Sequence, residues 1–157
     1  MAFFQKTFNL RKLLLYIGGT LAAAGISTLL GRPSFGDLIK PPLTPPGWLF
    51  PIVWSILYLL MGYAAYRISV SPAGERSGAL KAYWIQLAIN ALWTPLFFTL
   101  EWRLFAFFWL LLLIVTIVIT IVRFQPIDAL AAKLLYPYLA WCAFAAYLNL
   151  AFYVLNR

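Results

Sequence analysis

Three apolar segments each carry aromatic or amide side chains at helical spacing, and these residue types could bind a flat, largely apolar molecule. Residues three, four or seven positions apart share one face of a helix. Indole and phenol rings can stack on such a molecule, while amides can hydrogen-bond its few polar atoms. The three stripes are Trp54, Tyr58 and Met61; Gln86, Asn90, Trp93 and Phe97; and Trp141, Ala145 and Leu148, with Asn149 beside them.

The two amides in the second stripe indicate which way that stripe faces. An amide in hydrocarbon is costly unless it finds a partner, so Gln86 and Asn90 are expected to face the interior of a bundle or a cavity. Each residue alone has a structural interpretation, because amides often join membrane helices and aromatic rings often lie in interfacial belts. Only their combination on three segments favours a ligand.

Each stripe also has a proline near its tryptophan: Pro51, Pro95 and Pro137. Proline frees a backbone carbonyl one turn earlier and bends a helix. Bent helices with an aromatic and amide lining are expected to enclose a pocket.

Acid–base, hydrolytic and metal chemistry have little support in the sequence. Histidine is absent, which removes the commonest general base and the commonest metal ligand. The single cysteine, Cys142, lies in a hydrophobic stretch without a cluster of carboxylates. We therefore predict no metal site, no conventional catalytic residue and no required cofactor.

The composition is that of a membrane protein. Hydrophobic types make up 64% of the 157 residues and charged types 10%, against about 25% charged residues in a typical soluble domain. So few charges cannot cover a surface that faces water, so lipid must surround most of the chain. The net charge of +8 does not accumulate on one segment, which argues against a nucleic-acid partner.

Five stretches approach the roughly 20 apolar residues that a membrane-spanning helix needs. They are too long and too uniformly apolar for the strands of a membrane barrel. An alternative for the first stretch is a signal peptide, because Ala22–Ala24 resembles a cleavage site, but the apolar run continues through Leu30. We predict an all-α membrane protein, a single five-helix bundle over 1–157, with helices at 13–30, 47–68, 80–100, 104–124 and 134–155.

Positive charges in alternating loops predict the orientation. The side with more Lys and Arg is usually cytoplasmic, which places the N-terminus in the cytoplasm and suggests a bacterial cell membrane. The bias is eight to four: Lys6, Arg11, Lys12, Arg67, Arg76, Lys81, Arg123 and Lys133 against Arg32, Lys40, Arg103 and Arg157.

The linker at 31–46 differs from the other connections because it contains five prolines. Proline fixes an extended backbone path and removes donors. Such a stiff segment is either a lid folded over the end of the bundle or a plain rigid linker.

Three blocks in this order resemble the tryptophan-rich sensory protein and translocator protein family, also called the peripheral benzodiazepine receptor family. They are Pro-Pro-Gly-Trp at 45–48 with the segment through Tyr63; 86–98; and Leu-Leu-Tyr-Pro-Tyr at 134–138 with the segment through Asn149. The resemblance covers nearly the whole chain. One departure is Leu43, which stands where the family commonly has a tryptophan before the Pro-Pro pair, so a stacking contact from this position is lost.

The resemblance implies five helices, a pocket with the first loop as its lid, and often a homodimer. It implies binding of porphyrins such as protoporphyrin IX, of isoquinoline or benzodiazepine drugs and, in eukaryotic members, of cholesterol. It also implies light-dependent porphyrin breakdown with Trp54 and Trp141 as photochemical candidates. The ligand-binding residues we expect are Trp48, Trp54, Tyr58, Met61, Gln86, Asn90, Trp93, Phe97, Tyr138, Trp141, Ala145 and Leu148.

The leading functional hypothesis is a membrane protein that binds a porphyrin for sensing, transport or light-dependent breakdown. Arg32 and Lys40, near the predicted lid, could meet the porphyrin carboxylates. The alternatives are a transporter of sterol or lipid, and a structural membrane partner that associates through small residues of the first stretch: Gly18, Ala22, Gly25, Ser27 and Thr28. At the C-terminus, 150–157 fits a loose sterol consensus, which we interpret as an ordinary aromatic and basic helix end.

Overall fold

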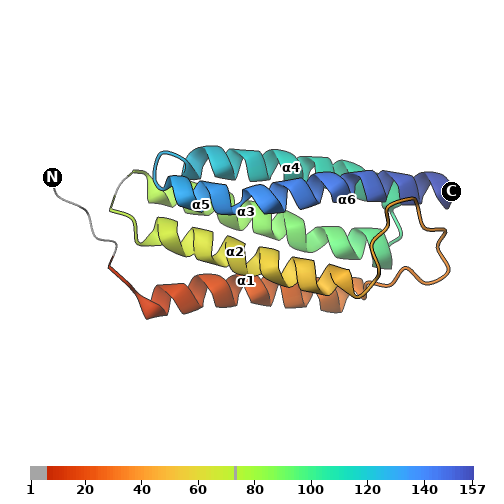
Figure 1. Ribbon diagram of the computed structural model, residues 1–157, viewed down its shortest axis with the longest axis horizontal. Coiled ribbons are helices and arrows are strands. Elements are labelled where there is room, and N and C mark those ends of the chain that lie inside the picture. Colours follow the sequence, from red (N-terminus) through yellow and green to blue (C-terminus); the bar gives the residue numbers. More distant parts are fainter. Residues whose placement is uncertain (1–6, 73) are drawn as a thin grey trace.

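A computed structural model describes residues 7–72 and 74–157, and the described chain contains helices and no strands. The elements are α1 (Leu10–Gly31), α2 (Leu49–Ser69), α3 (Arg76–Thr94), the π-helical η1 (Pro95–Thr99), α4 (Arg103–Phe124), α5 (Ala129–Leu134) and α6 (Tyr136–Leu155). The helices run side by side along the long axis of the molecule, and α1 forms one edge (Figure 1). This arrangement confirms the all-α class predicted from the sequence.

Four segments of the described chain are long and apolar enough to cross a membrane: α1, α2, α4 and the stretch Ala129–Leu155. The helix α3 is not among them because it carries Arg76 and Lys81 in its first half and Gln86 and Asn90 farther along. It packs against α1 and α4 within the bundle. The protein is therefore an integral membrane protein whose most polar helix has helical neighbours.

The prolines interrupt two of the three predicted pocket helices. Pro95 opens the π-helical turn η1, and a break at Leu135, just before Pro137, separates α5 from α6. Pro51 does not interrupt α2, because it lies in the first turn, where a helix needs no N–H donor from it. The expected bend is thus absent at Pro51, and the observed helices begin at 76 and 129 rather than at 80 and 134.

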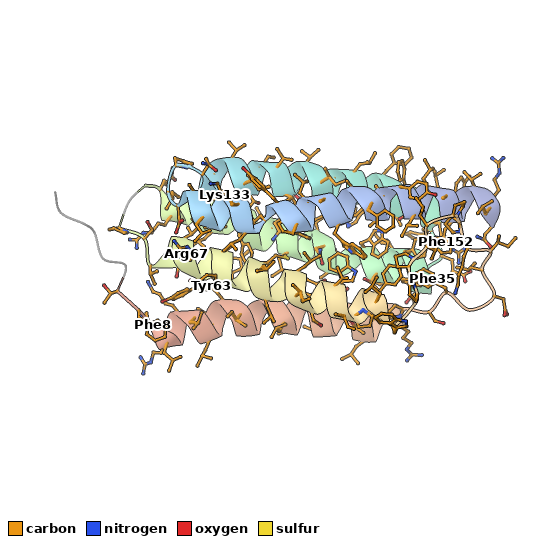
Figure 2. The ribbon with its side chains drawn as sticks, viewed as in Figure 1. Phe8, Phe35, Tyr63, Arg67, Lys133 and Phe152 are labelled. Carbon is orange, nitrogen blue, oxygen red and sulfur yellow. The ribbon has the colours of Figure 1, made fainter. Side chains whose placement is uncertain are left out.

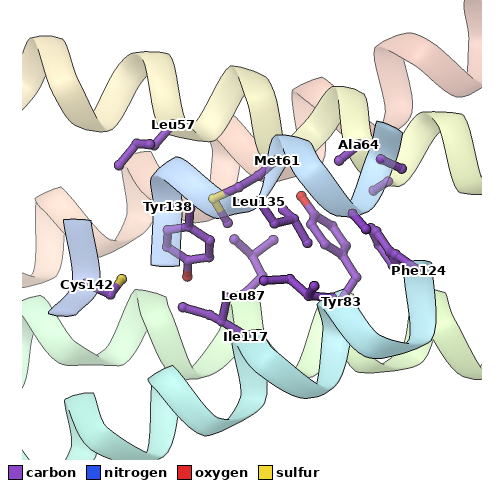
Figure 3. Close-up of a cluster of buried hydrophobic side chains, with 14 of the residues drawn as sticks. Leu57, Met61, Ala64, Tyr83, Leu87, Ile117, Phe124, Leu135, Tyr138 and Cys142 are labelled. Atoms are coloured by element: carbon purple, nitrogen blue, oxygen red, sulfur yellow. The ribbon is translucent and has the colours of Figure 1, made fainter. Parts of the chain in front are cut away.

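The core lies in the middle of the bundle and toward the end opposite the C-terminus. Leu57 and Met61 of α2, Tyr83 of α3, Ile117 of α4 and Cys142 of α6 belong to one buried cluster (Figure 3). Tyr83 also hydrogen-bonds the buried hydroxyl of Thr20, which joins α3 to α1. A second, smaller cluster around Phe97 and Phe152 lies nearer the C-terminal end.

The labelled side chains in Figure 2 locate the two ends of the bundle. Arg67 and Lys133 lie at the end where α1 begins, whereas Phe35 and Phe152 lie at the other end (Figure 2). At the first end, Arg67 forms an ion pair with the buried Asp128, and its Nε lies 2.9 Å from Oδ2 of the carboxylate. Of the residues used to predict the orientation, Lys6 lies outside the described residues, and the orientation in the membrane stays a prediction.

Helices α1 and α2 are in close backbone contact at Gly62. A Cβ at this position would lie 2.8 Å from the Cα of Ile17 and 3.2 Å from the carbonyl oxygen of Tyr16. Because both atoms belong to the backbone of α1, only a shift of the helix could make room. Small residues at such contacts allow membrane helices to pack closely.

We expect Gly62→Ala to lower the thermal stability of the protein in detergent. Overpacking costs about 1–3 kcal/mol, of which the better helix propensity of alanine offsets about 1 kcal/mol. The control is Gly18→Ala on α1, where a Cβ would meet nothing within 4 Å. Thermal unfolding followed by circular dichroism measures both variants, and equal midpoints for Gly62→Ala and the wild type would contradict this account of the packing.

Candidate functional site

A cavity of about 470 Å³ opens at the end of the bundle that carries the linker between α1 and α2. All of the long helices contribute to its wall. Ser27 of α1, Trp54 of α2, Asn90 of α3, Leu110 of α4 and Trp141 of α6 represent them. A volume of this size is typical of a small-molecule site.

The linker between α1 and α2 lies at the end of the bundle near the C-terminus (Figure 1), and its residues 33–36, Lys40 and Gly47 line the cavity, as those of a lid would. Phe35 is its innermost aromatic residue, and its ring stacks on Phe152 at 4.9 Å with an interplanar angle of 5°. The rings of Phe50 and Phe98 pack around it at 5.3 and 5.5 Å. Although Leu43 replaces the usual lid tryptophan and is exposed, the linker still brings one aromatic ring to the site.

Two side chains hydrogen-bond the linker to the bundle: Tyr147 of α6 and Asn156, the C-cap residue of that helix. Asn156 accepts a hydrogen bond from the N–H of Ile39 at 2.8 Å and donates one to its carbonyl at 3.0 Å. Tyr147 donates to the carbonyl of Pro42 at 2.8 Å. Proline and isoleucine carbonyls that would otherwise face the membrane interface thus receive partners within the protein.

Most of the residues predicted to bind the ligand do line the cavity. The structure brings residues from three helices together around one space, as their shared stripes indicated. Those on the wall are Trp54, Tyr58, Asn90, Trp93, Phe97, Trp141, Ala145 and Leu148.

Four predicted residues lie elsewhere, which corrects their expected positions. Met61, Gln86 and Tyr138 are buried and do not line the cavity. Met61 and Tyr138 belong to the buried hydrophobic cluster shown in Figure 3. Trp48 lies at the start of α2 with 67% of its surface exposed, so it faces away from the cavity. Helical spacing assigned Met61 and Gln86 to the correct face, but it could not tell how deep the cavity extends.

Asn90 joins α2, α3 and α6 at the floor of the cavity. Its Oδ1 accepts a hydrogen bond from the hydroxyl of Tyr58 at 2.8 Å, and its Nδ2 donates to the hydroxyl of Tyr138 at 2.7 Å. Tyr138 in turn donates to Oε1 of Gln86 at 2.8 Å. Both amides therefore connect helices, and Nε2 of Gln86 is buried without an acceptor among the described residues.

Asn149 has a similar role on the opposite wall. Its Oδ1 accepts a hydrogen bond from the indole N–H of Trp93 at 2.9 Å, and its Nδ2 donates to the carbonyl of Arg103 at 2.7 Å. The indole of Trp93 is thereby held with its ring on the cavity wall. Sequence analysis placed Asn149 beside the third stripe without assigning it to the site.

The unpartnered polar groups on the wall are few. In the part of the chain that the structure describes, the indole N–H of Trp141 is buried without an acceptor. Lys40, on the linker, is the one charged side chain on the wall among the described residues, and no carboxylate there pairs with it. Arg32 does not line the cavity. The cavity therefore offers a ligand aromatic faces and one cation.

Sequence reasoning missed wall residues from the remaining elements. Ser27 and Thr28 of α1 had been considered only as small residues, and Leu110 and Leu113 of α4 carry no distinguishing side chain. Phe35 could have been found only from its place in the lid. Within the described residues, no group of three His, Cys, Asp or Glu side chains lies close enough to hold a metal ion.

Comparisons with known proteins agree with this arrangement. A family model described as the TspO/MBR family matches residues 12–155. Protein CrtK of Rhodobacter capsulatus is 37% identical over 86% of this chain and 87% of its own length. The tryptophan-rich sensory protein of Cereibacter sphaeroides is 37% identical over 82% of this chain and 84% of its own length.

Similarity extends to animal proteins. The translocator protein of Ovis aries is 42% identical over 73% of this chain and 70% of its own length. Since the family model and these relatives cover most of the described helices, they confirm the resemblance found in the three sequence blocks, and the chain belongs to the TspO/MBR family.

Proposed function

We propose that this membrane protein binds a porphyrin-like tetrapyrrole in the cavity beneath the linker, in order to sense or transport it. The observation that carries the proposal is a deep cavity whose wall combines Trp54, Trp93 and Trp141 with a single cation at the linker. Two similar proteins are named for sensing and for translocation, which supports these two roles.

The aromatic wall suits a flat, conjugated ligand. The ring of Trp54 stacks near Tyr58 at 5.4 Å, and Trp141 packs against Phe50 at 5.9 Å and Phe144 at 5.5 Å. Rings held by such neighbours can contact a ligand without losing much side-chain entropy.

The charge distribution suits a ligand with a carboxylate at its outer edge. Lys40 lies on the linker at the cavity mouth, where an ammonium group can stay partly hydrated while it pairs with an acid. The deeper wall is uncharged, so the apolar macrocycle would enter first. Of the two cations considered from the sequence, the geometry supports Lys40 and not Arg32.

A second role is favoured by the positions of Trp54 and Trp141, which both line the cavity. Light absorbed by a bound porphyrin could draw an electron from either indole, and dioxygen would be the oxidant that completes ring breakdown. Conventional catalysis is not needed for this reaction. Sterol transport, a homodimer and insertion in a bacterial cell membrane with a cytoplasmic N-terminus stay further proposals.

Filling the cavity should prevent binding. We expect Ala145→Phe, which directs a ring into the cavity, to weaken protoporphyrin IX binding about fivefold or more, because overpacking of a fixed wall costs at least about 1 kcal/mol. Tryptophan quenching during titration in the dark measures the affinity. The matched control is Ala143→Phe, on the exposed side of α6. Equal affinity of both variants, or absence of saturable quenching by the wild type, would reject this site.

Removal of the Lys40 ammonium group should weaken the binding only of porphyrins that carry free carboxylates. We expect Lys40→Ala to weaken protoporphyrin IX binding about two- to fivefold at low salt, which is the usual range for a solvent-accessible ion pair, and expect Arg32→Ala to have no effect. The dimethyl ester of the same porphyrin should bind both variants and the wild type alike. A similar loss for ester and acid would show that Lys40 acts on folding of the linker rather than on the carboxylate.

Illumination should distinguish porphyrin binding from porphyrin breakdown. We expect Trp54→Phe combined with Trp141→Phe to retain porphyrin binding but to slow the light-dependent loss of porphyrin absorbance. The control is Trp84→Phe, because Trp84 lies off the cavity and stacks on Tyr16 at 5.7 Å. Loss at the wild-type rate in the double variant would remove the photochemical role, and no loss in any protein would leave sensing and transport.

A further inference from the structure

A second hollow of about 340 Å³ lies at the same end of the molecule, between the turn from η1 to α4 and the C-terminal end of α6. Trp102, Arg103, Phe105, Tyr153 and Arg157 form most of its wall. Its lining shares no residue with the cavity described above. It is therefore a separate place for a ligand.

The guanidinium group of Arg103 is the central polar group of this hollow. Only 15% of its side chain is exposed, and its Nε has no hydrogen-bond acceptor within the described chain. Its Nη2 lies 3.6 Å from Oε1 of Glu101, which is longer than a charge-assisted hydrogen bond. A buried N–H without an acceptor is costly. The group is thus placed to receive an acceptor from outside the protein.

The other side chains of the hollow add donors rather than acceptors. Arg157, the hydroxyl of Tyr153 and the indole of Trp102 have no acceptor among the described residues. Asn156 also lines the hollow, but its amide is already bonded to the linker. The carboxylate of Glu101 is the exception, and 68% of that side chain is exposed. A wall rich in cationic donors matches a ligand rich in anionic oxygens.

The surroundings of the hollow are those of a membrane interface. Trp102 and Phe105 are exposed, and tryptophan and tyrosine collect at the level of lipid headgroups. From Phe105 an exposed apolar stripe continues along α4 through Phe108, Leu112 and Val115. A molecule with its polar end in the hollow could therefore lay a hydrocarbon chain along this stripe.

We propose that the hollow binds a membrane phospholipid, with the phosphate held by Arg103 and Arg157 and an acyl chain along the α4 stripe. Arginine binds phosphate through two parallel N–H donors, and both Arg103 and Arg157 line the hollow. A sterol carries a single hydroxyl and no negative charge, so it would add no counter-charge for Arg157 and none beyond Glu101 for Arg103. Free phosphate would satisfy the cations but would not use the apolar stripe.

The test measures lipid binding to the delipidated full chain in neutral detergent by native mass spectrometry. The probes are phosphatidylglycerol, diacylglycerol with the same chains, inorganic phosphate and cholesterol. The variants are Arg103→Gln and Arg157→Gln, with Arg32→Gln as the control, since Arg32 is a cation at the same end that lies outside the hollow. Circular dichroism shows whether each variant is folded.

We expect one tightly bound phosphatidylglycerol per chain in the wild type and in Arg32→Gln. Affinity should fall about tenfold in Arg103→Gln and in Arg157→Gln, which corresponds to the loss of a charged hydrogen bond. Arg157→Gln keeps the proposal testable if Arg103→Gln does not fold. Equal binding by diacylglycerol, displacement by inorganic phosphate, competition by cholesterol, or no difference between the arginine variants and Arg32→Gln would each overturn it. None of these outcomes depends on whether the cavity binds porphyrin.

Discussion

Buried amides in a bundle surrounded by lipid impose the constraint on which the rest of this structure depends. No water is available in hydrocarbon to satisfy them, so each must find partners inside the protein. Asn90 does so with the hydroxyls of Tyr58 and Tyr138, and Asn149 with the indole of Trp93 and a backbone carbonyl. These bonds fix the relative rotation of α2, α3, α4 and α6.

The cavity follows from this constraint. Because Tyr58 and Trp93 are held by amides, their rings form a rigid floor and wall rather than filling the space between helices. Small Ala145 leaves room between larger neighbours on α6. The amides thus have two roles. They connect helices, and they also position the aromatic rings that line the cavity.

The end of the bundle near the C-terminus concentrates the features that have no purely structural explanation. The linker, the π-helical turn η1 and the end of α6 meet there, and Arg103 lies between the two hollows with its guanidinium 5.7 Å from the ring of Phe97. A π-helical turn is often retained where a binding site needs it. Here the turn carries Phe97 and Phe98, which both line the cavity.

Composition and periodicity by themselves determined the membrane class, the number of long helical segments and the inward faces of three of them, because lipid permits few patterns. They could not separate Trp54 and Trp141, on the cavity wall, from Met61 and Tyr138 in the core, since depth along a helix depends on its neighbours. Only the tertiary structure decided that Phe35 and Lys40 reach the site, because contacts made by a linker leave no period in the sequence.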